Sequence, residues 1–172
     1  MENKGYIHIY TGNGQGKTTA AFGLAVRALG AGKRVYIGQF IKSIKYNETD
    51  IENLHSNVKI EQFGRRCFID GDPTSEDFDA ARQGWKKSKH LLYSGQYDLV
   101  ILDELNIALH YKLLDMQDVI ESLQNRRTST EVIITGRYAP QEIIDIADLV
   151  TDMREIKHYY TQGILSRNGF DK

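Results

Sequence analysis

The sequence predicts an α/β fold with a mostly parallel central sheet that helices cover on both faces. Segments typical of strands alternate with segments typical of helices along all 172 residues. The run "YDLVILDE" at 97–104 has the continuous apolar character of a strand that is buried on both faces. The glycine-rich turn "TGNGQGKT" at 11–18 joins the first expected strand to the first expected helix. We therefore expect residues 1–172 to form a single domain.

The expected strands are short and rich in β-forming residues. Residues 6–10 predict the first strand, and the run at 149–160 alternates in character as an edge strand does. Because the strands alternate with helices, we expect them to run parallel to one another. The strands between these two are expected at 34–40, 58–63, 97–104 and 130–137.

Capping residues and glycines mark the expected helix ends. The helix that begins at Lys17 should end near the glycines at 30–32. For the long helix that ends near Ser94, Asp72 followed by Pro73 is one candidate start, and a capping box of Thr74 and Asp77 is the alternative. One face of that helix carries Phe78, Ala81, Trp85 and Leu92. Other helices are expected at 115–125, at 140–147 and, as a short turn in a mobile loop at 41–57, around 50–54.

Composition excludes several classes of function. The formal net charge of −1 indicates no bulk attraction to nucleic acid or to an anionic membrane. Cys67 is the only cysteine, which excludes an internal disulfide and a cysteine-rich zinc site. Neither a signal peptide nor an apolar run of 18 residues is present. We expect a cytoplasmic protein with no nucleic-acid or membrane partner.

The turn after the first strand has the core spacing of a phosphate-binding loop. Small residues let the backbone curl so that successive N–H groups face phosphate oxygens, and the helix N-terminus adds partial positive charge. Lys17 supplies a full charge, and the hydroxyl of Thr18 can reach a magnesium ion. The strict pattern has glycine where Thr11 stands, and a turn that only connects strand to helix is the alternative. The flanking elements and the Lys-Thr pair favour a nucleotide triphosphate site.

Two carboxylates follow the apolar run at 97–104. Asp103 and Glu104 stand where P-loop proteins place the acid that holds magnesium. A parallel strand brings its carboxyl end to the same sheet edge as the phosphate loop, and alternation points the two side chains to opposite faces. We expect one of the two to face the metal. Arg137 and Arg154 are candidate cations for phosphate transfer, but no catalytic base is evident, so position alone predicts a triphosphate and magnesium site and no reaction.

The sequence resembles the corrinoid adenosyltransferases of the CobA/BtuR type, which act on ATP and cob(I)alamin or a corrinoid precursor. The segments that carry the resemblance are "GNGQGKTTAAFGLAVRA", "GQFIK", "YDLVILDEL", "ITGR", "ADLVTDMREIKH" and "GILSRNGF", in order over nearly the whole chain. The resemblance implies a RecA-like fold, commonly a homodimer. It also implies that cobalt(I) attacks the 5′ carbon of ATP, with inorganic triphosphate as the leaving group. ATP would then lie reversed relative to most P-loop proteins, and no protein base is needed.

The resemblance also implies roles for individual residues. Lys17 and Glu104 would be catalytic, Thr18 and Glu104 would hold Mg²⁺ with Asp103 beside them, and Arg27 would contact the nucleoside. The family's phosphate loop corresponds to Gly12, Asn13, Gly14, Gln15, Gly16, Lys17 and Thr18, with Thr19 next to it. Like this chain, the family lacks the first glycine of the strict pattern, at the position of Thr11.

Two positions depart from the family pattern. Lysine is usual where Gln15 stands, so one cation near the triphosphate is lost. The family's Phe-x-Trp pair, which helps displace the lower axial ligand of the corrinoid, is matched only by Phe68. Either another aromatic residue takes the place of the tryptophan, with Phe63, Tyr46 and Trp85 as candidates, or the preferred corrinoid differs.

The sequence is compatible with three functions. The adenosyltransferase leads, and a RecA-type P-loop ATPase or kinase is the alternative enzyme. The third is a nucleotide-responsive binding module without chemistry. A flavodoxin-like reductant is a further expected partner, and the arginine pairs at 65–66 and 126–127 are where it could dock.

Overall fold

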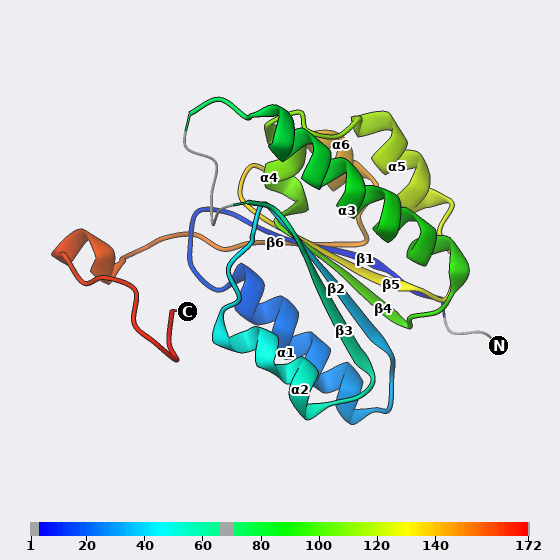
Figure 1. The fold of residues 1–172 in the computed structure, drawn as a ribbon, viewed down its shortest axis with the longest axis horizontal. Helices are drawn as coiled ribbons and strands as arrows, with labels where there is room; N and C mark the ends of the chain where they lie inside the picture. Colours follow the sequence, from blue (N-terminus) through cyan, green and yellow to red (C-terminus); the bar gives the residue numbers. More distant parts are fainter. Residues whose placement is uncertain (1–3, 66–70, 172) are drawn as a thin grey trace.

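The computed structural model describes residues 4–65 and 71–171 (Figure 1). Its centre is a six-stranded sheet of order β3-β2-β4-β5-β1-β6, in which every neighbouring pair is parallel. The strands are β1 (Ile7–Thr11), β2 (Val35–Phe40), β3 (Val58–Phe63), β4 (Leu99–Asp103), β5 (Glu131–Thr135) and β6 (Leu149–Asp152). The α/β fold class with a parallel sheet is thus confirmed, as is the edge position of the last strand.

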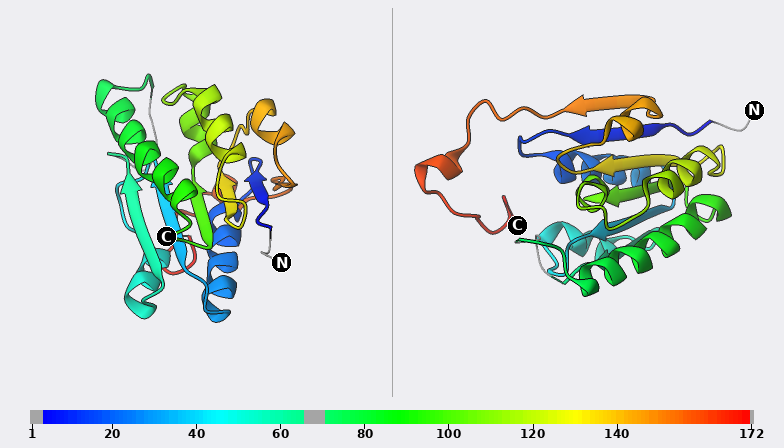
Figure 2. Two further views of the ribbon diagram at one scale, coloured as in Figure 1. Left: turned by 90° about the vertical axis from the view of Figure 1, so that its right-hand side faces the viewer. Right: turned by 90° about the horizontal axis from the view of Figure 1, so that it is seen from above.

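Helices lie on both faces of the sheet. Along the chain the strands step one way from β1 to β3 and the other way from β3 to β6. Because crossovers between parallel strands are right-handed, this reversal sends the connecting helices to opposite faces. Figures 1 and 2 show α1 and α2 on one face and the other α-helices on the opposite face. The helices are α1 (Lys17–Gly30), α2 (Ile51–Leu54), α3 (Ser75–Ser94), α4 (Leu105–His110), α5 (Met116–Gln124) and α6 (Gln141–Asp145), with 3-10 turns η1 (Asn47–Asp50) and η2 (Tyr159–Gln162).

Each face of the sheet has its own apolar cluster. Beneath α1, Phe22 and Leu29 pack on Ile37 and Ile101 from the strands. The cluster on the other face is larger and is closed by residues of α3, α4 and α5. It includes Tyr36, Phe40, Ala81, Trp85, Leu92, Leu102, Leu109 and Leu123. The predicted apolar face of α3 is therefore confirmed, and the sheet is packed on both faces by apolar side chains.

Three expectations about elements are corrected. The N-cap of α3 is Thr74, which forms a capping box with Asp77, so the start at Asp72 is wrong and the alternative box is right. The helix α4 was not expected, because its apolar sequence continues the strand before it without a break. The last strand ends at Asp152 instead of 160, since its partner β1 ends at Thr11, opposite Asp152, where the glycine-rich turn leaves the sheet.

The segment between β2 and β3 contains η1 and α2, in line with the short helix expected around 50–54. Its mobility stays a prediction. None of the helices within residues 4–65 and 71–171 is both long and apolar enough to cross a bilayer.

Candidate functional site

The carboxyl ends of the strands form the edge of the sheet where the candidate site lies. Two non-glycine residues directly after strands have positive φ angles: Ile41 at 66° after β2 and Glu104 at 60° after β4. Tyr138, three residues after the end of β5, has a φ of 59°. Such conformations cost about 1–3 kcal/mol each and persist where the surrounding structure enforces them, which is common at functional sites. The backbone strain of the described residues is thus concentrated at this edge.

The glycine-rich turn packs against the chain that leaves β6. The N–H of Gly14 donates to the carbonyl of Met153 at 2.6 Å, and a Cβ at Gly14 would lie 2.6 Å from that oxygen. Gly12 has φ of 94°, and a Cβ there would lie 2.1 Å from Oδ1 of Asp152. Thr11, which replaces the usual first glycine, accepts a 3.3 Å hydrogen bond from the N–H of Ala139. Glycine is therefore required at 12 and 14, whereas the hydroxyl at 11 helps to tie the turn to the β5–α6 connection.

Lys17 lies inside the turn at the start of α1. Its side chain is buried, and Nζ donates a 2.6 Å hydrogen bond to the carbonyl of Gly14. Burial lowers the pKa of Lys17, and the nearby carboxylate of Glu104 opposes this shift. The positive charge of Lys17 and the first N–H groups of α1 would both stabilise an anion bound in the turn. The arrangement is that of a phosphate-binding loop.

Asp103 is the centre of a buried polar cluster behind the turn. Oδ1 accepts hydrogen bonds from the hydroxyls of Thr18 at 2.8 Å and Thr135 at 2.6 Å. Oδ2 accepts from Nε2 of Gln39 at 3.0 Å and from Nζ of Lys42 at 2.7 Å. The side chain has no exposed surface. Asp103 therefore joins α1, β2 and β5 at the strand ends.

The charge of this cluster is stabilised internally. Burial opposes ionisation of Asp103, but the charge of Lys42 and the hydrogen bonds from Lys42, Thr135 and Thr18 outweigh it and lower the pKa. Burial would likewise lower the pKa of Lys42, but the Asp103 carboxylate outweighs it and raises the pKa. The two side chains are therefore a buried ion pair.

Glu104 lies in a different environment from Asp103. Its left-handed backbone turns the chain from β4 into α4, and its N–H donates to the hydroxyl of Thr135 at 3.0 Å. Its half-buried side chain lines a cavity of about 560 Å³ together with Lys17, Thr18 and Arg137. Burial, and next the charge of Asp103, raise the pKa of Glu104. Of the two adjacent carboxylates, Glu104 is the one that lines the cavity.

This cavity could hold a magnesium ion beside a triphosphate. The Thr18 hydroxyl and the Glu104 carboxylate both line it, and Mg²⁺ binds through oxygen ligands, often one or two side chains completed by water and phosphate. No cluster of three or more His, Cys, Asp or Glu side chains suited to a metal occurs within 4–65 and 71–171. The residues present fit a metal that enters with its nucleotide.

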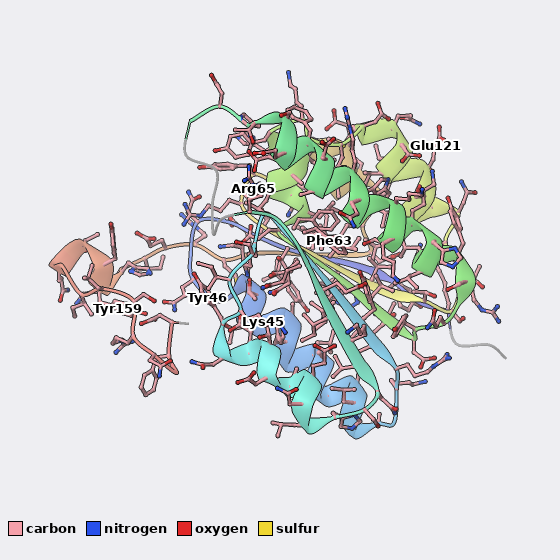
Figure 3. All side chains as sticks on the ribbon, in the orientation of Figure 1. Lys45, Tyr46, Phe63, Arg65, Glu121 and Tyr159 are labelled. Carbon is pink, nitrogen blue, oxygen red and sulfur yellow. The ribbon has the colours of Figure 1, made fainter. Side chains whose placement is uncertain are left out.

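The C-terminal segment forms part of the cavity wall. Nε2 of Gln15 donates to Oδ1 of Asp171 at 3.0 Å, and the hydroxyl of Tyr159 donates to Oε1 of Gln15 at 3.0 Å. Tyr159 also contacts Asp171, and Arg167 pairs with Asp171 at 2.9 Å. Figures 1 and 3 show this segment, with Tyr159 labelled, extending beyond the sheet edge before it turns back. Gln15 therefore connects the phosphate loop to the end of the chain.

The structure brings most of the predicted site residues together. The cavity is lined by Gln15, Gly16, Lys17, Thr18, Thr19 and Glu104, and Asp103 lies directly behind it. Arg27 is elsewhere: it is exposed in the last turn of α1 and lines a separate cavity with Tyr6 and His8. Phe68 lies outside the described residues. The role of Arg27 in nucleoside binding stays a prediction.

The three aromatic candidates for the missing tryptophan lie apart. Tyr46 lines the phosphate cavity. Phe63 stacks against Phe40 with ring centroids 6.0 Å apart, and Trp85 is buried in the core beneath α3. Figure 3 labels Tyr46 and Phe63 at separate places in the molecule. Only Tyr46 shares the cavity with the phosphate loop.

Sequence reasoning missed several members of the site. Lys42 had a usable signal, since it follows the second expected strand at the same edge as the phosphate loop. Thr135, at the end of β5, had the same signal. Asp171 and Tyr159 had none, because nothing in their local sequence predicts a contact with Gln15, 156 and 144 residues away.

Comparison with known proteins adds the family context. A family model described as ATP:corrinoid adenosyltransferase BtuR/CobO/CobP matches residues 3–171. A corrinoid adenosyltransferase of Escherichia coli K12 is 37% identical over 172 residues, which cover 99% of this chain and 87% of the relative. The corrinoid adenosyltransferase CobA of Salmonella typhimurium has the same identity and coverage, and one from Pseudomonas aeruginosa is 34% identical, with 99% and 85% covered.

Proposed function

Because the chain belongs to the ATP:corrinoid adenosyltransferase family BtuR/CobO/CobP, we propose that its phosphate loop binds the leaving group of an adenosyl transfer. The protein is an ATP-dependent corrinoid adenosyltransferase. The observation that carries the assignment of roles is the cavity in which Lys17, Thr18 and Glu104 meet. Binding of the triphosphate in this cavity is compatible with a reaction at the 5′ carbon of ATP, in which the triphosphate is the leaving group.

The proposed reaction is a nucleophilic substitution. The cobalt(I) of the reduced corrinoid supplies an electron pair to the 5′ carbon of ATP, and a Co–C bond forms. The bond between that carbon and its oxygen breaks, and the electron pair leaves with inorganic triphosphate. Both corrinoid and ATP are substrates, and the nucleophile is not a protein group. The absence of an assigned catalytic base in the sequence pattern is consistent with this chemistry.

The protein contributes position and charge. Lys17 and the N–H groups of the phosphate loop bind triphosphate, whose negative charge grows as the bond breaks. The hydroxyl of Thr18 and the carboxylate of Glu104 are suited to hold Mg²⁺, which when bound supplies positive charge to the triphosphate. Asp103 positions Thr18 through the 2.8 Å hydrogen bond. Lys17 and Glu104 are thus the proposed catalytic residues.

The remaining partners are proposed from the family resemblance. We infer a homodimer in the cytoplasm and a flavodoxin-like protein that reduces the cobalt. Cobalamin or a corrinoid precursor is the proposed acceptor. Size-exclusion chromatography with light scattering tests the dimer directly, and a single mass of one chain would contradict it.

One incubation tests the function. The purified protein is mixed with ATP, Mg²⁺ and chemically reduced cobalamin under anaerobic conditions, and the absorption spectrum and phosphate products are followed. Adenosylcobalamin, recognised by a light-sensitive spectrum, together with triphosphate is the expected result. ADP and phosphate without a new Co–C bond would indicate an ATPase or kinase instead. If neither set of products forms, the protein would be a nucleotide-binding module without chemistry.

A further inference from the structure

The C-terminal segment brings a carboxylate to the phosphate cavity. Gly169, Phe170 and Asp171 line this cavity, although the chain leaves the sheet at Asp152. In Figure 3 the label of Tyr159 marks the segment where it extends beyond the sheet edge. An acidic side chain in the wall of a triphosphate site opposes binding, because it has the same sign of charge as the ligand. The place of Asp171 is therefore unexpected for a phosphate cavity.

The charged side chains of the cavity wall balance one another. Among the described lining residues, the cations are Lys17, Lys42 and Arg137, and the acids are Glu48, Glu104 and Asp171. Lys42 is already paired with the buried carboxylate of Asp103 at 2.7 Å. Gln15, the residue of the phosphate loop that contacts the C-terminal segment, is neutral. The described side chains of the wall thus provide no excess of positive charge for an anion as highly charged as triphosphate.

Both oxygens of the Asp171 carboxylate accept hydrogen bonds. Oδ1 accepts from Nε2 of Gln15 at 3.0 Å and contacts the hydroxyl of Tyr159. Oδ2 accepts from the backbone N–H of Arg167 at 3.0 Å and from its Nε at 2.9 Å. The hydrogen bonds from Arg167 and then from Tyr159 lower the pKa of Asp171, so the group is ionised at neutral pH. Three side chains therefore donate to one anion at the edge of the phosphate cavity.

Arg167 is held next to the phosphate loop by this carboxylate. Only the carboxylate of Asp171 lies between Nε of Arg167 and the side-chain amide of Gln15. The guanidinium also lies over the rings of Tyr159 and Phe170, with Cζ at 4.7 and 5.3 Å from the ring centroids. Arginine stacks well on aromatic rings and keeps its N–H donors in the plane of the guanidinium while it does so. The side chain is 51% exposed, which leaves it accessible to an incoming anion.

We propose that Arg167 supplies a cation to the triphosphate of ATP, and that Asp171 holds Arg167 beside Gln15 until the phosphate replaces the carboxylate. The inference rests on the proposed function and names a further residue that binds the leaving group. The guanidinium presents a fork of N–H donors that fits phosphate as well as carboxylate. A bound triphosphate repels the like charge of Asp171 and accepts from the same donors. The loop then binds the triphosphate on one side and the C-terminal segment binds it on the other.

The first test measures nucleotide binding by calorimetry, with Mg²⁺ and without a corrinoid. Arg167→Gln should raise the Kd for ATP about three- to thirtyfold, between the scale of an exposed ion pair and that of a charged hydrogen bond. The Kd for inorganic triphosphate with Mg²⁺ should rise by the same factor, because the contact is to phosphate. Arg167→Lys keeps the charge and should lose less affinity than Arg167→Gln.

Arg34→Gln is the matched control. Arg34 is also 51% exposed and pairs with Asp98 at 3.2 Å, but it lies immediately before β2, at the opposite edge of the sheet from the phosphate loop. The variant removes the same charge from a comparable ion pair. Its Kd for ATP should equal that of the unchanged protein.

Asp171→Asn separates a cation for phosphate from an anchor for the segment. If Arg167 acted only by anchoring the segment through Asp171, Asp171→Asn and Arg167→Gln would both weaken ATP binding. The proposal expects opposite effects, because Asp171→Asn removes a negative charge from the cavity wall and releases Arg167. The Kd of Asp171→Asn for ATP should therefore fall about two- to fivefold.

Gln15→Lys places a cation in the loop next to the position of Arg167. With this lysine present, the triphosphate depends less on Arg167. Arg167→Gln should then change the Kd for ATP by less than about twofold when it is made in the Gln15→Lys protein.

Four outcomes would overturn the inference. An unchanged Kd for ATP in Arg167→Gln would remove the residue from the site, and a loss for ATP without a loss for inorganic triphosphate would assign it to the nucleoside. Weaker ATP binding in Asp171→Asn would show that Arg167 only anchors the segment. An equal effect of Arg167→Gln with and without Gln15→Lys would show that the two cations do not share a role.

The proposed function is tested apart from these binding measurements. It fails if the unchanged protein binds ATP but makes no adenosylcobalamin from reduced cobalamin. The role of Arg167 fails if that protein makes adenosylcobalamin while Arg167→Gln binds ATP and triphosphate as before. In the adenosylation assay, Arg167→Gln should lower kcat/KM for ATP and leave the corrinoid KM within about twofold.

Discussion

The hydroxyl of Thr18 donates a 2.8 Å hydrogen bond to the Asp103 carboxylate and so links the start of α1 to the end of β4, 85 residues apart. Lys42 pairs with the other oxygen of the same carboxylate. The two adjacent carboxylates therefore have different roles. Both oxygens of Asp103 accept hydrogen bonds from protein groups, whereas Glu104 lines the cavity.

Asp103→Asn should destabilise the protein. The substitution leaves the Lys42 ammonium, whose side chain is 12% exposed, without its buried counter-charge. Breaking a buried ion pair by removing one partner costs about 3–5 kcal/mol. Urea unfolding should therefore show a lower free energy of unfolding by about that amount. The double variant Asp103→Asn with Lys42→Met removes both charges and should recover part of the loss. No difference between the single and double variants would contradict the pairing.

Glu104→Gln should reduce activity and leave the fold intact. The substitution keeps the size of the side chain and removes a charge that burial already disfavours. Adenosylation should fall at least about tenfold if a magnesium ligand worth 1.4 kcal/mol or more is lost. The free energy of unfolding should not decrease, in contrast to Asp103→Asn. Full activity of Glu104→Gln would remove this residue from the proposed metal site.

Lys17→Ala should weaken ATP binding. The ammonium group lies within the phosphate loop, and charged hydrogen bonds contribute about 1.5–3 kcal/mol. The Kd for ATP with Mg²⁺, measured by calorimetry, should rise about ten- to a hundredfold. Lys33→Ala, at an exposed lysine just after α1, is the matched control and should bind ATP as before. Equal affinity of Lys17→Ala and the unchanged protein would reject the loop as a phosphate site.

Gln15→Ala should loosen the C-terminal segment. Gln15 holds both Asp171 and Tyr159 by 3.0 Å hydrogen bonds, and Asp171 in turn accepts from the N–H of Arg167 at 3.0 Å. Loss of the glutamine amide should speed hydrogen exchange at the Arg167 amide. Gln141→Ala removes an exposed glutamine that bonds Asp145 in α6 and should leave that amide unchanged. Identical exchange in both variants would show that Gln15 does not hold the segment.

Asp118 should make stability depend on pH in the acid range. Hydrogen bonds from Lys89 and then from Trp85 lower the pKa of Asp118. The folded pKa is below that of the unfolded chain, about 3.9, so the contribution is complete above that pH and disappears as pH falls through the folded pKa. The side chain is 39% exposed, which limits the effect to about 1 kcal/mol or less.

Asp118→Asn is the variant for this measurement. The difference in free energy of unfolding between Asp118→Asn and the unchanged protein should be largest near pH 6. It should shrink as the pH is lowered below about 4. A difference that is constant across this range would mean that the carboxylate charge does not contribute. Asp79→Asn, at an exposed aspartate of α3, controls for a general change of charge.

Local patterns were sufficient for most of the fold and for the glycine-rich turn that joins β1 to α1. β3 begins and ends where the sequence pattern places it, and α1 begins at Lys17 as expected, because apolar periodicity and glycine stops act over a few residues. The pattern failed where an apolar run changes from strand to helix, as at Leu105, since both elements bury such residues. It also failed beyond Asp152, where strand formation depends on how far β1 extends.

The sequence by itself determined the fold class, the glycine-rich turn between β1 and α1 and, through the matched motifs, the family. These depend on residues close together in the chain, whose spacing directly sets a turn, a helix start or a strand end. Only the tertiary structure decided which acid is saturated by Lys42 and which lines the cavity, and that Arg27 lies away from the loop. Those outcomes depend on which strand ends become neighbours in the sheet. They also depend on which side chains are buried and on which charges lie next to them in the folded chain.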